Sequence, residues 1–122
     1  MTEHWEAFTE FRFEAAHFLP KVPEGHKCRR LHGHSFRVRV SLWSAQLSKE
    51  GWVEDFATIK ERIEPIRQTL DHYLLNDIEG LENPTSENLA AWLWPRVKQV
   101  LPQLATVEVL ETCTSGCRYQ GP

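Results

Sequence analysis

The stretch HGHSFRVRVSL, residues 32–42, decides the fold because apolar and polar side chains alternate along it. Its apolar residues take every second position: Phe36, Val38, Val40 and Leu42. A period of two residues is typical of a strand with one buried face. Extending the same phase backward places His34, and His32 before it, on the apolar face. Two residues along a strand make one full pleat, so both imidazoles are expected to point the same way.

A second stretch with this period lies upstream. Its alternate positions hold Phe11, Phe13, Ala15 and His17. Residues 19–30, between the two stretches, carry two prolines, a glycine and several charges, a composition typical of a loop. We therefore expect two neighbouring strands with three imidazoles on one side of the sheet.

The period changes to 3.6 residues after Asp55, the expected N-cap of a first helix. The apolar stripe of this helix consists of Phe56, Ile59, Ile63, Ile66 and Leu70. Pro65 is expected to kink or split it, and residues 71–76 end it. A second helix is expected from Thr85 or Ser86 to about residue 101, and Pro95 is expected to interrupt it. Its inward residues are Leu89, Leu93, Val97 and Val100.

The strand period returns at residues 106–112, with Glu111 in phase with Val107 and Val109, and residues 118–120 are expected to form a short last strand. The order β-β-α-α-β-β predicts an α+β fold, an antiparallel sheet with two helices on one face, in a single domain over residues 1–122. One face and two edges of such a sheet stay uncovered, so we expect it to form homo-oligomers.

The composition narrows the class of protein. A formal net charge of −3 argues against general binding to nucleic acid or to a membrane surface. No apolar run approaches the roughly 20 residues that span a bilayer, and the acidic N-terminus has no apolar core of a signal peptide. Three cysteines, an odd number, are typical of reduced thiols in the cytoplasm.

Three histidines on one face of a sheet suit a zinc site, although such sites accept other metals too. His17, His32 and His34 would leave a fourth position open for water or substrate, as in catalytic zinc sites. Cys28 admits two interpretations. As a fourth ligand it would close a structural site; as a thiolate stabilised by Lys27 and the neighbouring arginines it would be a general base.

Two further groups admit a functional and a plain interpretation. Asp71 and His72 are adjacent, like pairs in which a carboxylate orients an imidazole, but the same pair is common as a charge effect at a helix end. Glu111 either grips a planar pair of donors on a heterocycle or lies where its strand enters solvent. The stretch from Asn83 to Glu87 fits the start of a helix.

Several stretches together resemble the 6-pyruvoyltetrahydropterin synthase family. They are FRFEAAHFLP, VPEGHKCRRLHGHSF, LDHYLLND, ENPTSENLAAWLW and ETCTSGC, and they cover nearly the whole chain in order. They are most similar to the bacterial branch, the 6-carboxy-5,6,7,8-tetrahydropterin synthases of queuosine biosynthesis. The three-residue gap between Cys28 and His32 favours that branch.

The resemblance implies the tunnelling fold, assembled into trimers or hexamers, and Zn²⁺ held by His17, His32 and His34. It implies that Cys28 is the catalytic base, which works with Asp71 and His72 from a neighbouring subunit. It also implies that Glu111 anchors the pterin ring. Thr85 and Ser86 match a block that contacts the pterin, and Lys27 is our candidate contact for a triphosphate.

The implied enzyme is a lyase that converts 7,8-dihydroneopterin triphosphate to 6-carboxy-5,6,7,8-tetrahydropterin, acetaldehyde and triphosphate. One alternative is 6-pyruvoyltetrahydropterin synthase, which eliminates triphosphate without breaking a carbon–carbon bond. The other is a non-catalytic zinc-stabilised binding module, which would unfold on chelation.

Overall fold

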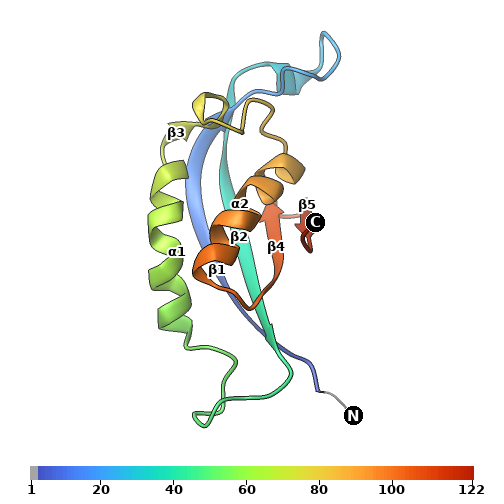
Figure 1. Cartoon of the computed structure of the whole chain (residues 1–122). Helices are drawn as coiled ribbons and strands as arrows, with labels where there is room; N and C mark the ends of the chain where they lie inside the picture. The colour runs from blue at the N-terminus through green and yellow to red at the C-terminus, as the bar shows by residue number, and fades with distance from the viewer. Residues whose placement is uncertain (1–2) are drawn as a thin grey trace.

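The computed structural model describes residues 3–122. The elements follow in the order β1 (Trp5–His17), η1 (Lys27–Arg29), β2 (His32–Ser44), α1 (Phe56–Leu70), β3 (Tyr73–Leu74), η2 (Leu75–Asp77), α2 (Ser86–Val100), β4 (Leu104–Leu110) and β5 (Gly116–Tyr119). Two long strands form the centre of a curved sheet, and α1 and α2 lie together on one side of it (Figure 1). The α+β class expected from the sequence is confirmed.

The strands β1 and β2 pair antiparallel along their whole length, and the register sets Ala15 opposite His34 and His17 opposite His32. The expected apolar face is confirmed, since Phe13 and Phe36 are almost completely buried and their rings stack with centroids 5.1 Å apart. The three histidines therefore continue the same buried face beyond the last apolar layer, at the end of the hairpin where the loop with η1 projects (Figure 1).

The sheet has the strand order β3-β1-β2-β4-β5 and is mixed, so the expectation of a purely antiparallel sheet was wrong. The added strand, β3, pairs parallel to β1 through Ala15 and Ala16. Two residues are too few to show a period, so the sequence pattern gave no sign of β3. The strand matters to the site because it fixes the residues just before it, Asp71 and His72, against β1.

Both helices are continuous through their prolines, so the expectation that these would split or interrupt them was wrong. Pro65 and Pro95 are both exposed, and water can satisfy the carbonyl that each proline leaves without a helical partner. The caps agree with expectation. Asp55 accepts a hydrogen bond from the Ala57 amide at 3.0 Å, and Thr85 is the N-cap of α2, accepting from the Asn88 amide at 3.0 Å.

The core lies between the helices and one face of the sheet. From the helices it includes Ile59, Ile63, Leu70, Leu89, Leu93 and Val97. The expected last strands also form, as β4 and β5, although β4 ends at Leu110. Glu111 therefore lies one residue beyond a buried strand, at the same end of the molecule as the histidines.

Candidate active site and metal centre

Three imidazoles converge at the end of the β1–β2 hairpin. One ligand atom from each of His17, His32 and His34 lies within 4.8 Å of the others. His17 is 1% exposed and the other two are half-buried. Among the histidine, cysteine and acidic side chains of residues 3–122, these three histidines have the spacing that suits a metal ion. The sequence prediction of a three-histidine cluster is therefore confirmed.

Backbone carbonyls fix which nitrogen of two rings faces the centre of the cluster. Nδ1 of His17 lies 2.9 Å from the Pro84 carbonyl oxygen, and Nδ1 of His32 lies 2.7 Å from that of Arg30. A carbonyl only accepts, so each Nδ1 carries the proton and each Nε2 keeps a free lone pair. Such outer hydrogen bonds are typical of histidines that bind metals.

The Nε2 atom of His17 is buried without a hydrogen-bond partner. A buried polar atom without a partner is costly unless something binds it. Burial is also the main reason that the pKa of His17 is lowered, which favours the neutral imidazole that a metal requires. The residues thus fit a metal ion, with three nitrogen ligands.

Glu111 lies beside this cluster. Its Oε1 is 3.3 Å from Nε2 of His34 and 3.7 Å from Nε2 of His17. Its Oε2 accepts a hydrogen bond from the hydroxyl of Ser86, the first residue of α2. The hydrogen bond from Ser86 therefore offsets part of the free energy that is lost when a carboxylate is partly buried at the end of a strand.

Cys28 lies in η1, on the loop that closes the hairpin, and it is half-buried and not in a disulfide. Cys28 and Lys27 line a hollow of about 350 Å³ together with His34, Ser86 and Glu111. Among the residues described, the metal-binding group does not include Cys28. The Cys28 thiol is therefore outside the group of ligand atoms that all lie within 4.8 Å of one another.

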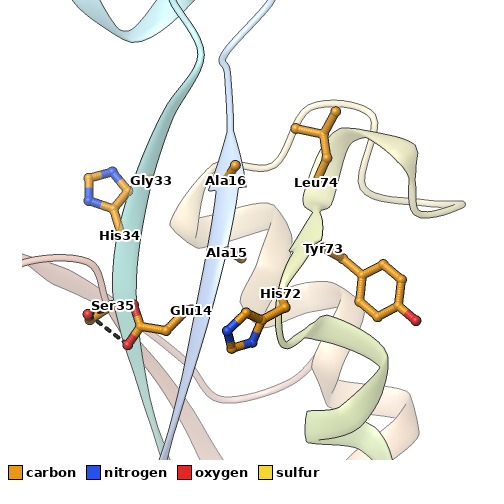
Figure 2. A pocket seen from close by; sticks show the side chains of 9 residues that line it. All are labelled: Glu14, Ala15, Ala16, Gly33, His34, Ser35, His72, Tyr73 and Leu74. Carbon is orange, nitrogen blue, oxygen red and sulfur yellow. Dashed lines mark hydrogen bonds between the residues drawn. The ribbon is translucent and has the colours of Figure 1, made fainter.

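Asp71 and His72 occupy a different place, at the junction of α1 and β3. The His72 ring meets the Asp71 carboxylate through Nδ1 and Oδ2, 2.9 Å apart. His72 lines a second hollow, of about 500 Å³, on whose rim Glu14, Ser35 and Tyr73 lie (Figure 2). The two hollows share His34, but Cys28 lines the first and His72 the second. A single chain therefore does not gather all the predicted catalytic residues around one cavity.

Sequence reasoning missed the groups that hold Asp71 and His72. The amide of Glu14 donates to Oδ1 of Asp71 at 2.9 Å, and the Glu14 carbonyl accepts from the His72 amide at 2.6 Å. Hydrogen bonds from Glu14 and then from His72 lower the pKa of Asp71, so it stays ionised. Backbone contacts of this kind leave no residue-type signature, and only the parallel strand β3 would have indicated them.

None of the helices in residues 3–122 combines the length and apolar character needed to cross a bilayer.

The antiparallel hairpin β1–β2 carries three histidines, and the cavity next to them is lined by Cys28 and Glu111. These features place the chain in the class of small α+β domains with a candidate metal site. Residues 6–122 match the family described as 6-pyruvoyl tetrahydropterin synthase, and the chain belongs to this family.

The chain is 52% identical over 124 residues to the 6-carboxy-5,6,7,8-tetrahydropterin synthase of Synechocystis, covering 97% of this chain and 95% of that protein. It is 38% identical over 90 residues to the dihydroneopterin monophosphate aldolase of Pyrococcus furiosus, covering 74% and 72% of the two chains. Among solved structures, the 6-pyruvoyl tetrahydropterin synthase of Caenorhabditis elegans superposes with a TM-score of 0.88 at 27% identity, over 99% of this chain and 98% of that one.

Proposed function

We propose that the chain is a zinc-dependent carbon–carbon lyase that forms 6-carboxy-5,6,7,8-tetrahydropterin, acetaldehyde and triphosphate from 7,8-dihydroneopterin triphosphate and water. The observation that carries this proposal is the unpartnered, buried Nε2 of His17 within a cluster of three histidines. A cavity lined by Cys28 and Glu111 adjoins the cluster. The 52% identity to a relative named for this product supports the choice among pterin reactions.

Each residue has a role that its surroundings support. Glu111 would anchor the pterin, because an ionised carboxylate accepts hydrogen bonds from a ring N–H and an amino group together. Cys28, as thiolate, would remove a proton from the side chain of the substrate. His72, oriented by Asp71, would return protons.

The three histidines would hold Zn²⁺, which when bound supplies a Lewis acid for the oxygens of the substrate side chain. Lys27 lines the same cavity and would meet the triphosphate. Thr85 and Ser86 at the start of α2 would lie against the pterin. The Thr85 hydroxyl oxygen already accepts a hydrogen bond as the helix cap, so its contact would come from the remaining capacity of that hydroxyl.

Because Cys28 and His72 line different hollows, we propose that they meet across the boundary between two subunits of a trimer or hexamer. We further propose that the enzyme works in the cytoplasm, in queuosine biosynthesis.

A product assay tests the proposal. Zinc-loaded protein is mixed with 7,8-dihydroneopterin triphosphate, and acetaldehyde and triphosphate are quantified. We expect equal amounts of the two. Triphosphate without acetaldehyde would indicate a pyruvoyl-type synthase. Consumption of the substrate with neither product would indicate an aldolase, which leaves the triphosphate on the cleaved fragment. Unchanged substrate, with folded and metal-loaded protein, would favour the non-catalytic binding module.

A further inference from the structure

The carboxylate of Glu111 lies within reach of the metal that the histidines would bind. Two ligand atoms on one tetrahedral zinc, each about 2.0–2.1 Å from the ion, are about 3.3–3.4 Å apart. Oε1 of Glu111 lies 3.3 Å from Nε2 of His34 and 3.7 Å from Nε2 of His17. Carboxylates are ordinary zinc ligands, so a small rotation of Glu111 would bring it to the fourth position.

Coordination by Glu111 would close the site. A catalytic zinc keeps one position free of protein ligands, whereas a site with four protein ligands is structural. The same carboxylate would also be lost as a hydrogen-bond acceptor for a bound heterocycle. Something in the chain must therefore favour the orientation in which Glu111 stays off the ion.

Ser86 is the group in position to do this. Its hydroxyl donates to Oε2 of Glu111, whereas Oε1 is the oxygen that lies near His34 and His17. The residue is 7% exposed and begins α2, where the Thr85 cap fixes the first turn. The hydroxyl thus comes from a buried and well-anchored element, while Glu111 follows the end of a strand.

We propose that Ser86 is a positioning residue that holds Glu111 away from the metal, so that the fourth coordination position stays open and the carboxylate stays available. The inference rests on the proposed function, in which Glu111 anchors a pterin. A hydrogen bond to a carboxylate is strong enough to change the balance between two orientations about tenfold or more. The Ser86 hydroxyl exerts this effect through its hydrogen bond to Glu111, separately from any contact that the start of α2 makes with the pterin.

The test uses the whole protein loaded with Co²⁺, whose visible absorption reports its ligands. In Ser86→Ala we expect a changed cobalt spectrum and about tenfold tighter Co²⁺ binding, because the released carboxylate joins the three histidines. Ser86→Thr keeps the hydroxyl and should behave as wild type. Ser115→Ala removes another hydroxyl from the same cavity and should leave the spectrum unchanged.

Two variants make the result decisive. In a Glu111→Gln background, Ser86→Ala should no longer alter the spectrum, because the neutral amide is a poor ligand. Glu111→Gln alone should match wild type. A spectral change in Glu111→Gln alone would show that Glu111 already binds the metal, and would overturn the inference even if Ser86→Ala failed to fold.

Identical cobalt spectra and affinities for wild type and Ser86→Ala would also overturn it. Binding of the unreactive probe 6-carboxypterin gives a second readout, and we expect about tenfold weaker binding to Ser86→Ala. These measurements need no turnover. If the cobalt results hold while the product assay fails, the proposed reaction is wrong and the role of Ser86 stands.

Discussion

At the scale of single residues, the metal centre depends on the hydrogen bonds made behind each ligand. The Pro84 and Arg30 carbonyls accept from Nδ1 of His17 and His32, which turns both Nε2 atoms toward the cluster. Both carbonyls belong to segments outside the long strands. The histidines themselves are residues of β1 and β2, but loop residues fix the orientation of two of their rings. The strand period predicted which histidines share a face, but it carried no information about these acceptors.

The role of Cys28 can be tested by its removal. We expect Cys28→Ala to keep one metal ion per chain and to lose turnover by about 10²–10⁴-fold, because a general base contributes a factor of that size. Metal content by atomic absorption and the product assay check the two parts. Cys113→Ala removes an exposed cysteine and is the matched control. Loss of metal from Cys28→Ala would make the thiol a fourth ligand and the site structural.

At the scale of elements, the sequence predicted those whose period is long enough to read. The strands β1 and β2 alternate over many residues, and the caps Asp55 and Thr85 carry their own signature. The two-residue strand β3 is too short to be predicted in this way. The sequence also could not show that α1 and α2 stay continuous through Pro65 and Pro95, because this depends on the exposure of the residues around each proline. The position of His72 followed from β3 and was equally hidden.

His72 has a φ of 67°, in the left-handed region that a histidine seldom adopts. Two hydrogen bonds with the backbone of Glu14, in β1, hold the turn in this conformation. The Glu14 carbonyl accepts from the His72 amide, and the Glu14 amide donates to the Asp71 carboxylate. A strained residue held by its surroundings is common at functional sites, and here the strain directs the His72 ring into the hollow of Figure 2.

The hydrogen bonds of the Asp71 carboxylate predict that the stability of the folded chain depends on pH. The pKa of Asp71 is lowered in the folded chain, first by the Glu14 amide and then by His72. The charged form therefore stabilises the fold above the unfolded pKa of about 3.9, and this contribution is lost as pH falls through the lower folded value. We expect Asp71→Asn to unfold at a lower temperature than wild type near neutral pH.

The difference in melting temperature should shrink below about pH 4 and vanish once Asp71 is protonated in both states. Melting curves from pH 2 to pH 7 check this. Glu50→Gln, in the loop after β2, is the control and should follow wild type throughout. A constant difference between Asp71→Asn and wild type at every pH would mean that the charge of Asp71 does not act on the fold.

At the scale of the whole molecule, the sheet face opposite the helices is polar and carries a ladder of charges across four strands. Arg39 pairs with Glu10 at 2.8 Å and with Glu108 at 3.8 Å, and Glu108 meets Arg118 at 3.3 Å. Large apolar side chains are exposed as well, among them Trp5, Phe8, Trp43 and Tyr73. A molecule with one uncovered sheet face, short edge strands and exposed aromatics is a good candidate for assembly.

Assembly would also explain why Cys28 and His72 line different hollows, and mixing two inactive variants tests this. Cys28→Ala and His72→Ala are each expected to be inactive. If each site takes Cys28 from one chain and His72 from another, random mixed oligomers have both intact residues in about one quarter of their sites. Co-refolded mixtures should therefore regain up to about a quarter of wild-type turnover.

Sedimentation velocity should show trimers or hexamers of the 14.2 kDa chain. No recovery from well-mixed oligomers would show that both residues of a site come from the same chain, and a monomer in solution would leave no partner to complete the site.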